Sequence, residues 1–385
     1  MASLLPSNWR RRQALVCIVT LLAALGLAWT SPRLAKEDWD WTWQFQKIVR
    51  KARTHNLNWK EEGDGYYEQL LNTSDWVGTA KSGTFLDGLR RRAEPPPEIV
   101  DYAGSFLVYE LKPNLDVWHP EEWELITNAH GLADIPYTLE KPPGTRRIAL
   151  LGDSVSRSMG VPLGHNYEAL LEERLNERHT GGANRRFEIL NFSASGYRIT
   201  QFVDLASEKA ARFQPDVYVL ALTDLIFRAW SEHLWSLISH GIDLKYDYLR
   251  EVVQSSGAAR GLGHTESKRR LEPYRLEVIR WALRHIREAA GPGVPVVIFL
   301  IPNADEWEVL ERRFYSTKEL LAEFDFPVID VLDTFDRVPD LEILRLTPMN
   351  LHFNARGHRI LFENLYRKLR EDPHAWKSIA GNDAP

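Results

Sequence analysis

The chain has 385 residues, of which 44% are hydrophobic and 26% are charged, proportions typical of a chain that buries a core. The net charge of -5 argues against nucleic acid as a partner, because proteins that bind it usually carry a strongly basic face. The single cysteine, Cys17, excludes a disulfide framework and a cysteine-based metal site within the chain.

The N-terminus carries a localisation signal. Arg10 to Arg12 precede an uncharged apolar run from residue 13 to residue 30, which reaches roughly 27 Å at about 1.5 Å per residue, close to the ~30 Å of a hydrocarbon core. Because the positive flank favours the cytoplasm, residues 1–30 are predicted to be a cytoplasmic tip and a transmembrane anchor. The rest of the chain would then be extracytoplasmic, either periplasmic or at the cell surface. A cleaved signal peptide is the alternative interpretation, since Ala24 and Gly26 are small residues of the kind found before a cleavage site.

Residues 31–143 are predicted to be an N-terminal extracytoplasmic region with linkers. Pro95 to Pro97 form a stiff connector, because consecutive prolines favour an extended conformation. The segment from Asp101 to Leu139 is predicted to fold as a small lobe against the main domain. The sequence Pro142-Pro143-Gly144 then marks a domain boundary.

Beyond this boundary, apolar runs of strand length alternate with helical periodicity. The predicted strands are Arg147–Gly152, Phe187–Phe192, Val217–Leu222, Val294–Ile301 and Val328–Leu332. Nearly continuous apolar strands that alternate with helices indicate a parallel sheet covered on both faces, and right-handed crossovers then give a three-layer α/β/α sandwich. We therefore predict an α/β domain with a parallel five-stranded sheet over residues 144–372, followed by a tail over residues 373–385.

The connection between the third strand and the next predicted helix, Leu276–Ala289, is unusually long. Structureless connections of that length are rare in compact domains. Residues 228–272 are therefore predicted to be a helical cap insertion over the site.

A serine directly follows the first predicted strand, in the sequence Gly152-Asp153-Ser154. Ligands of parallel α/β sheets bind beyond the carboxyl ends of the strands, so Ser154 is a candidate nucleophile. A helix is expected to begin soon after it, with free N–H groups that favour developing negative charge. The alternative is that Asp153 or Ser154 only caps that helix.

A histidine, His352, lies between the fifth predicted strand and the last amphipathic helix. Its loop is expected to border the loop that holds Ser154, and a neutral imidazole near a hydroxyl is what nucleophilic catalysis requires. The alternative for His352 is a helix-capping role. His358 is interpreted as a first-turn residue of the helix that points away from the site.

These sequence blocks, taken in order, resemble the SGNH/GDSL hydrolase superfamily over residues 146–370. The matching blocks are Gly152–Ser154, Asn191–Tyr197, Leu222–Asp224 and Asn350–Asn354. The preceding segments Tyr109–Pro113 and Thr127–Leu132 are similar to bacterial members found near cell-surface polysaccharide pathways. The resemblance implies a flavodoxin-like SGNH fold in which Ser154 is the nucleophile, with His352 as the base. It also implies an oxyanion hole built from the backbone N–H groups of Ser154 and Gly196, with Thr223 at the position of the family's asparagine.

Two positions depart from the family's pattern. Thr223 has a shorter side chain than asparagine, and the loss of one well-aimed oxyanion donor costs about 2.7–4 kcal/mol. Met349 stands where the family has an acid, and Asn350, two residues before the histidine, is not a carboxylate either. Candidates to orient the imidazole are Asn350, a backbone carbonyl, Asp224, Asp330 and Asp336.

The main hypothesis is a serine esterase that hydrolyses an ester, such as an O-acyl group on a cell-surface glycan, through an acyl-enzyme. One alternative is an O-acyltransferase in exopolysaccharide modification, although Asp116–His119 has the wrong spacing for the Asp-x-His pair of such enzymes. The other is a catalytically weak glycan-binding or assembly protein, which the substitutions Thr223 and Asn350 would suit. The expected partners are the membrane, through the N-terminal helix, and an acylated small molecule or saccharide. No cofactor and no metal are expected, because the sequence has neither a His-Glu-x-x-His motif nor a Gly-rich phosphate loop.

Overall fold

The computed structural model describes residues 97–102, 104–119, 123–178, 186–303, 307–347 and 350–381. The chain divides into two units, Met1–Gly63 and Asp64–Pro385, and every described residue belongs to the second unit. The predicted anchor and most of the predicted N-terminal region therefore lie outside the described residues. Within the described ranges, no helix combines the length and apolar character needed to cross a membrane.

A five-stranded parallel sheet forms the centre of the second unit. Its spatial order is β6 (Arg186–Asn191), β5 (Thr145–Leu151), β7 (Val217–Leu222), β8 (Val296–Leu300) and β9 (Val328–Asp330). Every residue of β7 and β8 is buried, which is why the sequence reads as continuous apolar runs rather than as an alternating pattern. The predicted parallel five-stranded α/β fold is confirmed.

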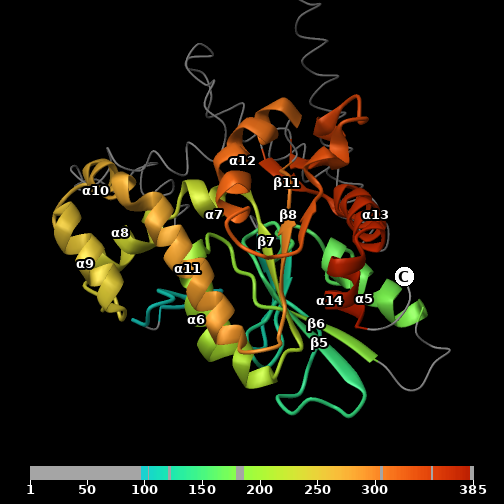
Figure 1. The fold of residues 1–385 in the computed structure, drawn as a ribbon. Coiled ribbons are helices and arrows are strands. Elements are labelled where there is room, and N and C mark those ends of the chain that lie inside the picture. Colours follow the sequence, from blue (N-terminus) through green and yellow to red (C-terminus); the bar gives the residue numbers. More distant parts are fainter. Residues whose placement is uncertain are drawn as a thin grey trace, which may run out of the picture. The chain divides into compact units, whose positions relative to one another are not determined.

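Helices cover both faces of the sheet (Figure 1). One face carries α6 (Ile199–Asp204) and α11 (Arg275–Ala290), and the other carries α5 (Tyr167–Arg178), α13 (Ala355–Glu371) and α14 (Pro373–Ala380). Alternate residues of β7 enter two separate cores, with Leu220 in the core beneath α11 and Val219 in the core beneath α13. The three layers follow from this two-sided burial.

The segment before the sheet belongs to the same fold. It contains two short antiparallel pairs, β1 (Val100–Asp101) with β2 (Glu110–Leu111) and β3 (Asp116–His119) with β4 (Trp123–Ile126). Phe106 and Leu107 are buried in the core that also contains α11. The segment expected to be a small lobe therefore shares the core of the main sheet.

The connection after β7 is helical and consists of α7 (Asp224–Arg228), α8 (Ser231–His240), α9 (Asp247–Ser256) and α10 (His264–Leu271). Leu234, Leu249 and Leu271 of these helices are fully buried in the core beneath α11, and Figure 1 shows α8, α9 and α10 beside α11. The region expected to be a tail contains α14, whose Trp376 and Ile379 are buried against α13 and the sheet.

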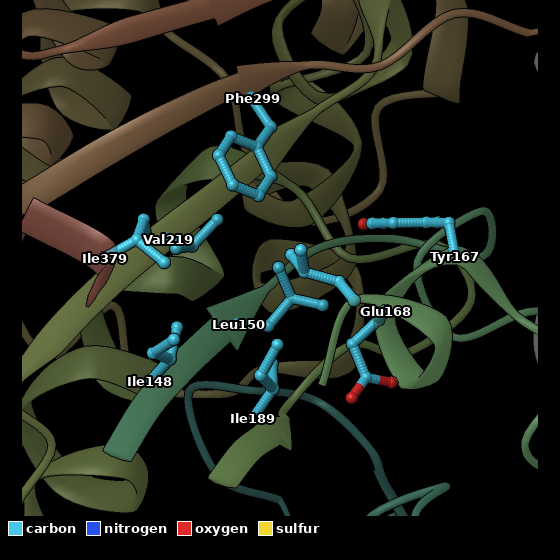
Figure 2. A pocket seen from close by; sticks show the side chains of 9 residues that line it. Ile148, Leu150, Tyr167, Glu168, Ile189, Val219, Phe299 and Ile379 are labelled. Atoms are coloured by element: carbon cyan, nitrogen blue, oxygen red, sulfur yellow. The ribbon is translucent and has the colours of Figure 1, made fainter. Parts of the chain in front are cut away.

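A small apolar cavity lies inside the core on the α5 side of the sheet (Figure 2). It is lined by Ile148, Leu150, Tyr167, Glu168, Leu171, Ile189, Val219, Phe299 and Ile379. The lining includes neither Ser154 nor His352, so this cavity belongs to the packing of the core rather than to the site described below.

A fully buried arginine anchors β5, the strand that leads to Ser154. Arg147 donates from Nε to Glu188 Oε2 of β6 at 2.8 Å, and its terminal nitrogens donate to the backbone oxygens of Leu139, Phe213 and Thr138. Both charged side chains are almost fully buried. A buried ion pair of this kind is strongly destabilising to break, because the remaining charge is left uncompensated.

Arg147→Leu is therefore expected to lower the free energy of unfolding by about 3–5 kcal/mol, measured by urea denaturation. Arg186→Ala is the matched control, because the Arg186 side chain is 62% exposed and lies 3.7 Å from the same Glu188. Arg186→Ala is expected to lower the free energy of unfolding by less than about 1 kcal/mol. Equal losses in the two variants would contradict the assigned role of Arg147.

Candidate active site

Ser154 lies at the carboxyl end of β5, on a turn that only glycine permits. A Cβ at Gly152 would lie 2.5 Å from Ser156 Cβ and 2.8 Å from Ser193 Oγ. The residues after Ser154 form consecutive turns, closed by hydrogen bonds such as Arg157 N to Asp153 O at 2.9 Å. The next helix, α5, begins only at Tyr167. The expectation that a helix begins soon after the serine and presents its N-terminus there is therefore wrong, because the chain first forms several turns.

His352 lies on a short hairpin that brings it to the same edge of the sheet. The hairpin pairs β10 (Arg345–Thr347) with β11 (Asn350–Phe353) in antiparallel fashion, and α13 follows directly. His352 Nε2 lies 2.7 Å from Ser154 Oγ, and both residues are buried. The structure thus brings together the serine and the histidine that the sequence singled out.

The side chain of Asn350 orients the imidazole. Its Oδ1 accepts from the backbone N–H of His352 at 3.0 Å and lies 2.7 Å from Nδ1 of the ring. A backbone N–H can only donate, so the amide presents its oxygen there, and Nδ1 must carry the proton that it donates to this oxygen. Nε2 is then unprotonated and can accept the proton of Ser154. Asn350 therefore selects the productive tautomer, although it brings no negative charge.

Burial and a nearby cation weaken the histidine as a base. Burial, and secondarily the charge of Arg157, lower the pKa of His352 to about 3. Arg157 is itself buried, and its Nε donates to Ser195 Oγ at 2.9 Å. The imidazole is thus neutral over a wide pH range, but it holds the serine proton less strongly than a triad with a carboxylate would.

Two backbone N–H groups are available for a developing oxyanion. Those of Ser154 and Gly196 donate to no acceptor among the described residues. Gly196 has a φ of +84°, and a Cβ there would lie 2.6 Å from the hydroxyl of Tyr109, so the turn requires glycine. The Tyr109 hydroxyl donates to the backbone oxygen of the neighbouring Ser195 at 2.5 Å, which holds the turn in place.

The hydroxyl of Thr223, the third expected oxyanion donor, is used elsewhere. It donates to Asp153 Oδ2 at 2.5 Å, and both side chains are buried. A hydroxyl has one proton to donate, so in this arrangement Thr223 stabilises the Asp153 carboxylate rather than a substrate oxygen. Burial raises the pKa of Asp153, while the bonds from Thr223 and from the Val155 N–H oppose that shift.

Two of the three carboxylates that were candidates to orient His352, Asp224 and Asp330, are bonded to other side chains. Asp224 accepts from Asn303 Nδ2 at 3.0 Å and from Arg228 Nε at 3.2 Å, and Asp330 pairs with Lys318 at 2.7 Å.

His358, expected to point away from the site, is buried. It receives the Tyr167 N–H at 3.4 Å and stacks on that ring. Among the described residues, no group of three or more histidine, cysteine, aspartate or glutamate side chains could hold a metal ion.

A buried polar network ties the Ser154 loop to β6. Asn191 Nδ2 donates to Ser156 O at 2.8 Å and to Glu168 Oε2 at 3.3 Å, and its backbone N–H donates to Asp134 Oδ2 at 2.9 Å. Burial, and then the neighbouring carboxyls, raise the pKa of both Asp134 and Glu168. This network, like Arg157, was not found from the sequence. Its only sequence signal is the presence of polar residues next to the strand ends.

A profile of the GDSL-like lipase/acylhydrolase family matches residues 150–360, which contain Ser154, Gly196 and His352. The chain belongs to this family. It is an ester-hydrolysing enzyme with an SGNH α/β fold. No curated protein was found to match the sequence.

Solved structures similar to this GDSL-like hydrolase include TesA, with 15% identity, a TM-score of 0.38 and coverage of 59% of this chain and 99% of the other. An acetylxylan esterase from Geobacillus stearothermophilus has 15% identity and a TM-score of 0.38, covering 58% of this chain and 94% of the other. A two-domain esterase active on acetylated mannans has 13% identity and a TM-score of 0.39, covering 63% of this chain and 52% of the other. These likenesses carry no information about the substrate of this hydrolase.

Asn350→Asp is expected to raise kcat on a small p-nitrophenyl ester by about tenfold. A carboxylate beside Nδ1 keeps the tautomer and stabilises the imidazolium, and opposite charges at such distances shift a pKa by about 1–3 units. Asn350→Leu, which removes the acceptor, is the matched variant and is expected to lower kcat. Steady-state kinetics of both variants test the assignment, which fails if neither substitution changes kcat.

On the acid side of the pH profile, kcat/KM is expected to fall only at a pH well below the pKa range of an ordinary histidine. The neutral imidazole is the active form, and a folded-state pKa of about 3 for His352 keeps it neutral until the pH falls towards that value. Activity should therefore persist at about pH 5, where a histidine with a pKa near ~6.5 would be mostly protonated. Circular dichroism at each pH controls for unfolding. A limb with its midpoint near 6.5 would contradict the buried state of His352.

Proposed function

We propose that this hydrolase is a serine esterase that removes an O-acyl group from a cell-surface glycan through an acyl-enzyme at Ser154. The observation that carries the proposal is the 2.7 Å contact between Ser154 Oγ and His352 Nε2, with Nδ1 of the same ring held by Asn350. A neutral imidazole in this tautomer can take the proton of a hydroxyl that is too weak to attack unaided.

The reaction would proceed in two steps. Ser154 Oγ forms a bond to the ester carbonyl carbon while His352 Nε2 takes the serine proton. The carbonyl oxygen becomes an oxyanion that the backbone N–H groups of Ser154 and Gly196 can bind. The bond to the alcohol oxygen then breaks, and the alcohol leaves with the proton from His352. Water, deprotonated by the same imidazole, cleaves the acyl-enzyme to give the acid and free Ser154.

The glycan assignment rests on the similarity of the block Tyr109–Pro113 to bacterial members found near cell-surface polysaccharide pathways. Tyr109, from the block similar to polysaccharide-associated members, donates to the backbone of Ser195, and its own backbone oxygen accepts from the Tyr197 hydroxyl at 2.8 Å. This block therefore supports the turn that contains Gly196. An extracytoplasmic location with a membrane anchor, proposed from Arg10 to Arg12 and the apolar run after them, would place the enzyme where such glycans occur.

Ser154→Ala in the full chain is expected to lower kcat on p-nitrophenyl acetate by at least about 10³-fold, because removal of a catalytic serine leaves only binding and the oxyanion hole. Ser207→Ala is the matched control, since Ser207 is exposed and its hydroxyl donates to the backbone oxygen of Val203 at 2.9 Å. Hydrolysis that survives in Ser154→Ala at the unmutated rate would exclude Ser154 as the nucleophile.

A further inference from the structure

Two arginines hold the turn that contains Gly196. Arg157 Nε donates to Ser195 Oγ at 2.9 Å on one side of Gly196, and Arg198 Nη1 donates to Tyr197 O at 3.3 Å on the other. Both guanidinium groups therefore lie at the edge of the sheet where Ser154 and the oxyanion donors are found. Neither residue belongs to the sequence blocks from which the site was predicted.

The guanidinium of Arg198 is incompletely satisfied. Its Nε is buried and meets no acceptor in the part of the chain that the structure describes. Its Nη1 donates to a backbone oxygen, and no carboxylate of the described residues forms an ion pair with it. Buried polar groups are nearly always hydrogen-bonded, and an exception calls for an explanation. A ligand that supplies an anionic acceptor would explain it.

The charges of these arginines act on the catalytic groups. Arg198 lowers the pKa of the Asp153 carboxyl, next to Ser154, against the raising effect of burial. Arg157 lowers the pKa of His352 and so weakens the base. Further along the same edge, Asp224 is shared by two cations, with Arg228 at 3.2 Å and Arg313 at 3.9 Å. A cation that lowers the pKa of the base slows the reaction of a neutral substrate. The negative charge of a bound anionic substrate would offset this effect on the pKa.

We propose that the ester cleaved at Ser154 carries an anionic group, such as a carboxylate, and that Arg198 binds this group beside the oxyanion turn. This inference rests on the proposed function. It narrows the substrate class to an acidic ester, in which the charge belongs either to the acyl group or to the alcohol. Guanidinium is suited to this task because its planar set of donors matches a carboxylate.

The test compares kcat/KM of the full chain on matched charged and neutral esters. Mono-p-nitrophenyl succinate against p-nitrophenyl acetate places the charge on the acyl group, and acetylated polygalacturonate against acetylated mannan places it on the alcohol. In one of these pairs the anionic ester is expected to be preferred, and Arg198→Gln should lower the ratio by about tenfold or more, as for loss of a hydrogen bond to a charged group. Arg198→Lys should restore part of the ratio, and the exposed Arg212→Gln should leave it unchanged.

If Arg198→Gln lowered kcat/KM equally on charged and neutral esters, the proposal would be overturned. Arg198 would then act on the oxyanion or stabilise the fold rather than bind an anionic group of the substrate. An absence of preference in both pairs would also overturn it. Measurements of ligand binding distinguish a failure of this proposal from a failure of the proposed function. In the Ser154→Ala background, calorimetry should still show tighter binding of the anionic member of a pair, and Arg198→Gln should abolish that difference whether or not the parent chain turns the ester over.

Discussion

The hydrogen bond between Ser154 Oγ and His352 Nε2 joins residues that are 198 positions apart in the chain. It forms only because β5 ends at the same edge of the sheet as the β10–β11 hairpin. The position of β5 in turn depends on Arg147, which ties it to β6 and to the segments before and after it. The chemistry therefore depends on the packing of the whole domain.

The catalytic pair combines the geometry of a triad with an unusual charge balance. Asn350 provides the acceptor that fixes the imidazole tautomer, but its amide brings no negative charge to the ring. Arg157 adds a positive charge close to it. Burial strengthens the effect of the Arg157 charge on the imidazole, since charges interact more strongly where water is excluded. The result is a base that remains neutral in acid but is weak unless a bound anion compensates the arginine.

Much of this site could be predicted from the sequence, because the strands are buried on both faces and β5 and β7 give way directly to the polar segments Gly152–Ser154 and Thr223–Asp224. That pattern places Ser154 at the carboxyl edge of the sheet, and the position of His352 between the last strand of the sheet and the last amphipathic helix places it at the same edge. The remaining features depend on which way a side chain points. Thr223 has a hydroxyl that could donate to either a substrate or Asp153, and only coordinates show that Asp153 receives it. Arg198 resembles an ordinary surface arginine in the sequence, and its unsatisfied Nε appears only once the surrounding residues are in place.

Labelling with a fluorophosphonate, followed by peptide mapping, shows whether His352 activates the hydroxyl of Ser154. This probe reacts with serines that are activated as nucleophiles. We expect one adduct, on the peptide that contains Ser154, and the loss of this adduct in His352→Ala. An adduct on a different serine, or unchanged labelling of Ser154 in His352→Ala, would show that this pair is not the catalytic one.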